Sequence, residues 1–174
     1  MLNLQSPRWK ELNQADGDAA SIPKLLETFL AHPTDENGLL LDPDDLLYGS
    51  LCHQALTVYD ATYAALPHIV NRANNLPPRQ RLRLLVFAGA VEAARMLSAD
   101  SPAIPEDLRS SYFKCLTIAT DLAHTDLRDE WSVLEHRYLA GAFLALVGKQ
   151  RLGQFISNLD MHGDPLEWGE DDAP

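Results

Sequence analysis

The sequence predicts an all-α protein, a short, right-handed α-solenoid in which about seven or eight helices stack as hairpins. Three observations lead to this prediction. Apolar residues recur at helical spacing along most of the chain, and the alternating pattern of a strand appears nowhere over a useful length. In addition, a short motif returns at intervals of about 40 residues, which is typical of helical repeats.

The expected helices follow one another along the chain, and capping residues or prolines mark where several of them begin. A capping side chain followed by proline signals a helix start, and the apolar spacing then indicates how far the helix runs. The predicted starts and segments are Ser6-Pro7, Asp42-Pro43, Pro77-Pro78 to Leu97, Pro105 to Ala123, Trp131 to Leu146 with Gly148 as its stop, and Gly153 to Leu159.

Length and composition indicate how the chain is organised. Its 174 residues, 46% of them hydrophobic, suit one folded domain, which we expect over residues 1–159, followed by an acidic tail over 160–174. No apolar run reaches the roughly 20 residues of a membrane span, and the N-terminus lacks the apolar stretch of a signal peptide. Two cysteines are too few for a disulfide scaffold. These features predict a cytoplasmic protein.

The repeated motif is the most informative feature of the sequence. Ala20–Leu26 and Ala64–Val70 share the order Ala, small, aliphatic, Pro, polar, aliphatic, aliphatic, and they lie 44 residues apart. A weaker copy, Pro102–Leu108, follows after a further 38 residues. Periods of about 40–47 residues are typical of two-helix solenoid repeats of the HEAT and armadillo kind. One such pair cannot cover its own apolar face, so neighbouring pairs must stack.

The stretch Leu51–Val70 resembles a group of small bacterial HEAT-like proteins, most of them uncharacterised. Trp9–Leu12 and Ile22–Leu26 fit the same group, and the resemblance extends over residues 6–97. It implies an α-solenoid that binds proteins. Some small acidic bacterial solenoids are immunity proteins against toxins, and that role applies here by analogy only.

The charge balance indicates what kind of partner to expect. The formal net charge of −11 comes from 25 acidic and 14 basic residues, so general affinity for nucleic acid is not expected. The two ends of the chain are acidic, whereas residues 72–95 carry five arginines against one glutamate. We therefore expect a bipolar molecule that binds another protein, a basic one, and neither nucleic acid nor a membrane.

A group of polar and aromatic residues within the stretch that carries the resemblance is the first candidate for partner binding. In one interpretation its aromatic and polar side chains line a concave surface; in the other they cap a helix, tie it to its neighbour and pack. The residues are His53, Gln54, Tyr59, Asp60 and Tyr63.

The acidic tail is the second candidate. Trp168 can serve as an anchor, with Glu170, Asp171 and Asp172 facing a basic partner. Alternatively, the tail is a disordered, solubilising terminus, or it folds back onto the chain's own arginines between Arg72 and Arg83.

Arg72, Arg79 and Arg83 form a third candidate, for an anion or an acidic partner; in the other interpretation they are dispersed charges at a solvated helix start. Some HEAT-like proteins are DNA glycosylases that hold the duplex in a basic groove, which makes a nucleic-acid-processing enzyme an alternative function. Arg79 and Arg83 lie near a predicted helix N-terminus, where the helix dipole favours acids, so local rules do not explain them.

No catalytic, metal or cofactor motif is present in the sequence. Cys52 and His53 are adjacent, so on a helix their side chains point apart, and Cys115 lies on an apolar helix face. The His, Asp and Glu residues between His124 and His136 lack the spacings of zinc or carboxylate-bridged metal sites.

The sequence therefore predicts a non-enzymatic protein-interaction module without a cofactor. Its sharper form is an immunity or antitoxin-like protein that blocks a basic toxin sterically and electrostatically. A scaffold or assembly factor is the remaining alternative, and only the identity of the partner separates it from the immunity role.

Overall fold

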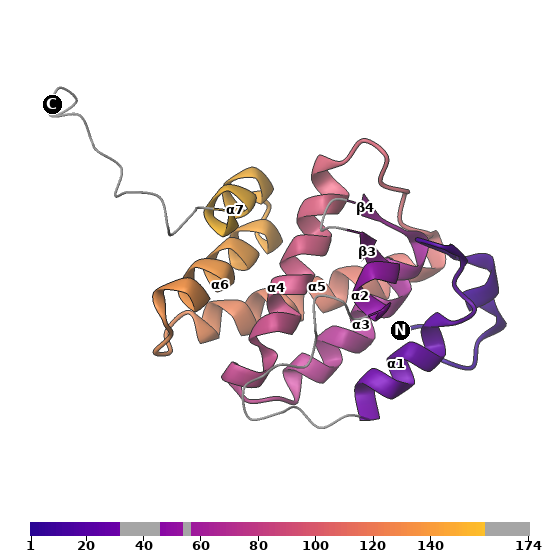
Figure 1. Cartoon of the computed structure of the whole chain (residues 1–174), viewed down its shortest axis with the longest axis horizontal. Coiled ribbons are helices and arrows are strands. Elements are labelled where there is room, and N and C mark those ends of the chain that lie inside the picture. Colours follow the sequence, from indigo (N-terminus) through magenta and orange to yellow (C-terminus); the bar gives the residue numbers. More distant parts are fainter. Residues whose placement is uncertain (32–45, 54–56, 159–174) are drawn as a thin grey trace, which may run out of the picture.

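The computed structural model describes residues 1–31, 46–53 and 57–158 of the chain, and these form an all-α fold (Figure 1). The predicted fold class is confirmed: the helices pack on one another as a short helical solenoid. A 3-10 helix, η1 (Pro7–Glu11), precedes the α-helices of this part of the chain. They are α1 (Ile22–Ala31), α2 (Leu46–Leu51), α3 (Asp60–Asn74), α4 (Pro78–Leu97), α5 (Glu106–Asp126), α6 (Val133–Leu146) and α7 (Gln150–Ser157).

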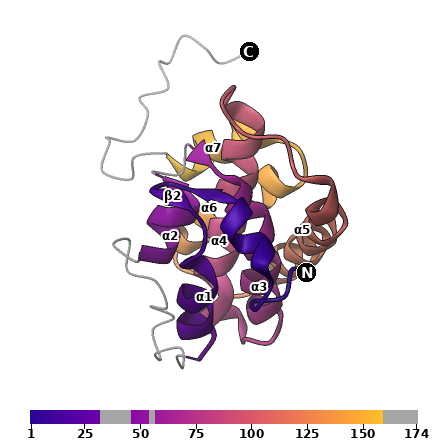
Figure 2. The ribbon, with the colours of Figure 1, turned by 90° about the vertical axis from the view of Figure 1, so that its right-hand side faces the viewer.

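Helix α4 is the centre of the arrangement, since it packs against α3, α5, α6 and α7. On one side of it, α3 lies along α5, and the N-terminal segment lies beside both (Figure 2). On the other side, α6 and α7 form the pair that ends the described part of the chain. Trp9, Tyr63 and Tyr112 are among the largest fully buried side chains, and every residue from 61 to 70 in α3 is buried.

The predicted helix starts are confirmed where local capping specifies them. The hydroxyl of Ser6 accepts a hydrogen bond from the Arg8 amide at 3.3 Å, although the helix it caps is 3-10 rather than α. Helix α4 begins at Pro78, and α6 begins behind a capping box in which Ser132 and Glu135 bond each other's backbone amides. The predicted start at Asp42-Pro43 lies outside the described residues.

Two very short antiparallel hairpins were not predicted. The strands β1 (Asn13–Gln14) and β2 (Gly17–Asp18) pair with each other, as do β3 (Cys52–His53) and β4 (Thr57–Val58). Each strand has two residues, which is too short for an alternating pattern to be visible in the sequence.

The prolines of the repeated motif occupy three different positions. Pro23 is the second residue of α1, Pro67 lies inside α3, and Pro105 is the N-cap of α5. The motif therefore recurs at α1, α3 and α5, with α2 and α4 between them, and its proline does not hold one equivalent position in these helices.

Candidate functional site

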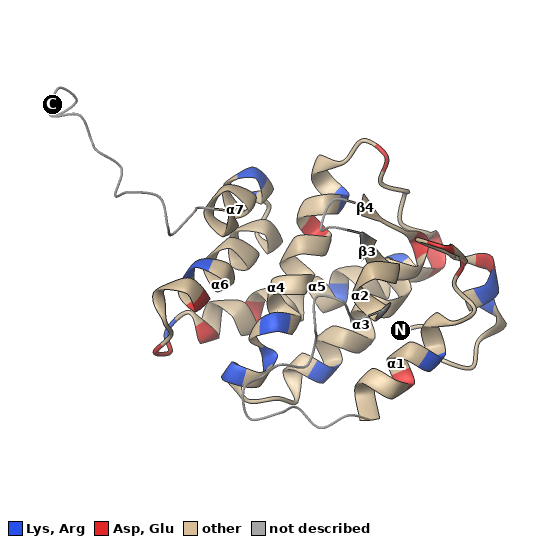
Figure 3. Cartoon of the chain, viewed as in Figure 1, with Lys and Arg blue, Asp and Glu red and all other residues tan. Residues whose placement is uncertain are grey.

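The described helical body is electrically neutral, and this is the first feature that bears on function. Residues 1–31, 46–53 and 57–158 contain 14 acidic and 14 basic side chains. Residues 32–45 and 159–174 contain the other 11 acidic residues and no lysine or arginine. Helices α1, α5 and α6 each carry both signs, as Figure 3 shows for α6, whereas α4 carries four arginines and one glutamate. The net charge of the protein thus belongs to two segments, not to a bipolar helical body.

The first predicted group divides between the core and the chain around the β3–β4 hairpin. Tyr63 is fully buried, its hydroxyl donates to the carbonyl of Pro102 at 2.8 Å, and its ring meets that of Tyr112 edge-on at 5.1 Å. Burial raises the pKa of Tyr63 to about 12. The structure therefore gives Tyr63 a packing role and leaves it no surface with which to contact a partner.

The neighbours of Tyr63 are tied to the start of α3. Tyr59 is the N-cap, and its amide donates to the hydroxyl of Thr62 at 3.0 Å. Asp60 is half-buried and accepts a hydrogen bond from the Asn13 side chain at 3.0 Å, which links α3 to the β1–β2 hairpin. His53 lies in β3, while Gln54 falls outside the described residues.

The acidic tail residues Trp168, Glu170, Asp171 and Asp172 also lie outside the described residues. The described part of the chain ends just before this segment, at Asn158, the C-cap of α7.

The predicted anion-binding arginines have partners within the protein. The Arg79 guanidinium lies 5.6 Å from the ring centre of Trp131, donates to the carbonyl of Glu130 at 3.3 Å and approaches Glu135 at 3.9 Å. Arg72 and Arg83 are half-buried, and each also interacts with other groups of the protein. Contacts with the α5–α6 connection explain why arginine occurs near the start of α4 against the preference of the helix dipole.

Arg81, which sequence reasoning did not single out, makes the strongest of these contacts. Its Nε, at 2.7 Å, and its Nη2 bond the two carboxylate oxygens of Asp126, and its Nη1 donates to the carbonyl of Leu76 at 3.1 Å. Asp126 is fully buried. These bonds hold the start of α4 against the end of α5.

A second buried polar cluster joins α4 to α5 at the other end. Glu92 is 5% exposed and accepts two hydrogen bonds from Arg95 and one from Tyr112. Burial and the negative charge of Glu92 raise the pKa of Tyr112, and burial raises that of Cys115 to about 12. A thiol reacts as its thiolate, so burial and the raised pKa both lower the reactivity of Cys115. Glu92, charged within an apolar helix and three residues before Arg95, was the sequence signal for this cluster.

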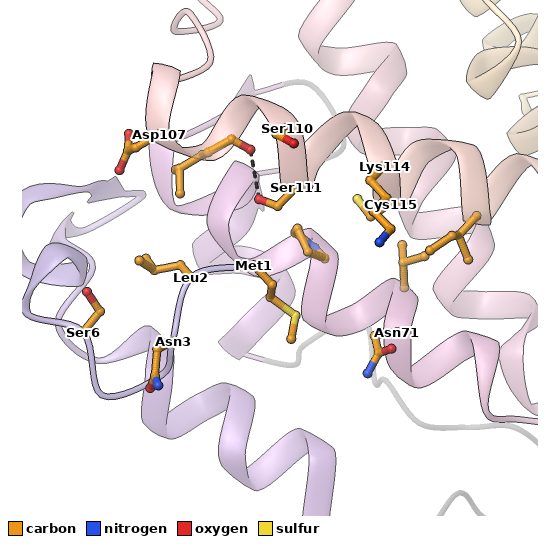
Figure 4. Close-up of a pocket in the computed structure, with 14 residues that line it drawn as sticks. Met1, Leu2, Asn3, Ser6, Asn71, Asp107, Ser110, Ser111, Lys114 and Cys115 are labelled. Carbon is orange, nitrogen blue, oxygen red and sulfur yellow. Dashed lines mark hydrogen bonds between the residues drawn. The ribbon is translucent and has the colours of Figure 1, made fainter.

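A hollow of about 700 Å³ lies between the N-terminal segment, α3 and α5 (Figure 4). Ser110, Ser111 and Lys114 of α5 line one side, and Asn71 of α3 lies opposite. Arg8 ties the N-terminal segment to α5 by bonding Asp107 at 3.0 Å, and this bond lowers the pKa of Asp107. The hollow is large enough for a small molecule. In the described part of the chain, no three His, Cys, Asp or Glu side chains are grouped as a metal site requires.

Helices α6 and α7, at the end of the described chain, carry apolar side chains with large exposed fractions. Val133 and Phe155 are 70% and 62% exposed, and Leu152 is 49% exposed. The backbones of the two helices lie very close, because a Cβ on Gly153 would stand 2.4 Å from the carbonyl oxygen of Gly141. Small residues thus form the contact between the two helices, and Leu152 and Phe155 lie outside it.

The fold and these surfaces define an all-α protein with a neutral body and two acidic segments. Comparison with protein-family models, with curated proteins and with solved structures gave no match. Within the described residues, no helix is both long enough and apolar enough to cross a membrane.

Proposed function

We propose that this chain is a cytoplasmic, non-enzymatic protein-interaction module that binds a basic partner protein. In its sharper form it acts like an immunity or antitoxin protein, covering the functional surface of a basic toxin. One observation carries the proposal: all of the net negative charge lies in residues 32–45 and 159–174, next to a neutral helical body.

Segregated charge favours steering of a partner. Where acidic and basic side chains are interspersed, their electric fields largely cancel a short distance from the surface. Salt screens the field that remains, with a Debye length of about 8 Å at physiological ionic strength. The eleven acidic residues of the two segments have no lysine or arginine within their own segments to cancel them. A basic partner would therefore be attracted to these two segments, and the attraction would act mainly on the rate of association.

The titratable groups of the core support a non-enzymatic role. Burial raises the pKa values of Tyr63, Tyr112 and Cys115, so their ionised forms are even scarcer at neutral pH than in an unfolded chain. A tyrosine or cysteine that acts as a nucleophile needs a lowered pKa. Glu92 bonds Arg95 and Tyr112 within the core, as expected of a structural group.

The proposal is tested first by capture and then by kinetics. The full-length protein is used as bait in a nuclease-treated lysate of its own organism, and the captured protein is identified and purified. Association is then measured at low and at physiological salt. We expect a basic partner whose association rate falls steeply with salt.

Two matched variants assign that effect to the tail. Glu170→Gln, Asp171→Asn and Asp172→Asn together remove three charges from the tail. The control, Asp16→Asn, Asp100→Asn and Asp121→Asn, removes three exposed charges from the helical body. We expect the tail variant to lower the association rate about tenfold at low salt and the control to lower it much less.

A captured protein that is acidic, or a rate that both variants change equally, would refute the proposal. A basic toxin would support the immunity form, whereas a basic housekeeping protein would make the module a scaffold or assembly factor.

A further inference from the structure

Helix α7 carries an apolar stripe on a side turned away from α6. Gly153 faces α6, since a Cβ there would meet the backbone of Gly141 and Ala145. Leu152 and Phe155 are three residues apart and exposed, and the half-buried Ile156 lies four residues after Leu152. These three residues, the α7 stripe, share one side of the helix. In a stacked helical array the next element covers such a side.

Basic side chains border the α7 stripe. Arg151 lies one helical turn before Phe155 and is exposed, and Lys149, the N-cap of α7, is also exposed. The first turn of α7 contains no acidic residue. The stripe is therefore apolar with positive charge at its N-terminal end, where the helix dipole adds to that charge.

We propose that the chain's own C-terminal segment, residues 159–174, docks on the α7 stripe. The segment contains Leu166 and Trp168 to meet the apolar side chains, and six acidic residues to pair with Arg151 and Lys149. Its composition is thus complementary to the stripe in both respects, apolar against apolar and acid against base.

The length of the segment permits this docking. It begins directly after Asn158, the C-cap of α7, and 16 extended residues span up to about 50 Å. Helix α7, with its eight residues, is only about 12 Å long. The chain can therefore turn back and follow the whole stripe. Because the tether holds the segment at an effective concentration in the millimolar range, even a weak contact is populated.

The arginines at the start of α4 fit this segment less well. Arg79 already stacks on Trp131 and pairs with Glu135, so an acidic tail would have to compete with those contacts. Arg151, by contrast, is exposed. It lies on α7, the helix that leads into the segment, seven residues before the C-cap Asn158.

This inference goes beyond the proposed function, since the docking is intramolecular and requires no partner. If both hold, a basic partner that binds the tail must first displace it from α7. Each can fail without the other, because the docking is measured on the isolated protein.

The test follows Trp168 by fluorine NMR in the full-length protein labelled with 5-fluorotryptophan. Trp9, Trp131 and Trp168 give three signals, and Trp168→Phe identifies the one of interest. The labelled peptide 159–174 supplies the signal of the undocked segment. We expect the Trp168 signal of the protein to differ from that of the peptide.

Variants then locate the docking site. Phe155→Ser removes an apolar side chain that is already 62% exposed, and Arg151→Glu reverses a charge without removing apolar contact. Each should move the Trp168 signal most of the way to its position in the peptide. Phe113→Ser, at a 46% exposed site on α5, is the matched control and should leave the signal in place. Thermal melting checks that every variant is folded.

Three results would overturn the proposal. The first is a Trp168 signal that already coincides with that of the peptide. The second is a signal that responds to Arg79→Glu and not to the two α7 variants, which would place the tail at the start of α4. The third is a signal that shifts with dilution, which would make the occupant the tail of a second copy.

Discussion

The hydroxyl group of Tyr112 donates a hydrogen bond of 2.8 Å to a carboxylate oxygen of Glu92, and both side chains are buried. Arg95 bonds both oxygens of the same carboxylate, at 2.8 and 2.6 Å. The buried charge is thus matched by a cation and by a third donor from another helix. This cluster is a cross-link between α4 and α5 that depends on each donor.

Tyr112→Phe should destabilise the protein by about 1.5–3 kcal/mol, because it removes a bond to a buried charged acceptor while it keeps the ring in place. Unfolding in urea measures the loss. Tyr138→Phe, at a 37% exposed site on α6, is the control and should change the stability little. Equal losses in the two variants would show that the bond to Glu92 contributes nothing.

Asp126→Asn should cost about 3–5 kcal/mol, because it leaves the Arg81 guanidinium, 11% exposed, without its counter-charge. The exposed pair of Arg109 and Glu106 provides the comparison, and Glu106→Gln should cost no more than about 1 kcal/mol. Chemical denaturation of both variants checks the ranking. A larger loss for Glu106→Gln would contradict it.

Gly153→Ala should separate α7 from α6. The new Cβ would lie 2.4 Å from the Gly141 carbonyl oxygen, and backbone atoms cannot yield as a side chain could. We expect a loss of about 1–3 kcal/mol, with faster amide hydrogen exchange confined to α6 and α7. Gly49→Ala in α2, where a Cβ meets nothing within 4 Å, should be neutral or slightly stabilising. Unchanged exchange in α7 would refute this account of the contact.

His68 should make the stability depend on pH below neutrality. Its Nε2 donates to the carbonyl of Leu2 at 2.8 Å, and burial lowers its pKa below the ordinary value of 6.5. Above pH 6.5 the neutral form is present in both the folded and the unfolded state, and stability is complete. As the pH falls from 6.5 through the lowered pKa, the unfolded state binds the proton first and stability is lost.

His68→Gln, which can still donate to Leu2, should therefore lose less stability than the unmodified protein between pH 7.5 and 5.5. Urea unfolding at the two pH values measures the difference. His124→Gln, at an exposed position on α5, serves as the control. A pH dependence that is identical in the unmodified protein and in His68→Gln would disprove the role of His68.

The long helices could be predicted because their boundaries depend on neighbouring residues. Helix α4 was expected from Pro77-Pro78 to Leu97 and runs from Pro78 to Leu97, and α6 ends at Leu146 as expected. Proline, capping side chains and Gly148, with its φ of +85°, act within one turn of the chain. The two hairpins were missed because strands of two residues show no alternation.

The candidate site was predicted less well. The aromatic and polar character of the group around Tyr63 was visible, but its burial depends on α5, which supplies Tyr112 from 49 positions further along the chain. Arg79 was noted because it conflicts with the helix dipole, and its explanation, Trp131, lies in another helical connection. Such contacts join residues that no local pattern relates.

Local chemistry was thus enough to decide that this chain is helical, where its long helices begin and that its excess acid lies toward its ends. Tertiary packing alone decided which charges cancel inside the body. Arg81 bonds Asp126, which lies 45 positions further along the sequence. Helix α7 contacts α6 through Gly153, so the α7 stripe lies on a side that α6 does not cover. Helical propensity and capping act over one turn, whereas burial and ion pairing depend on which helices lie side by side.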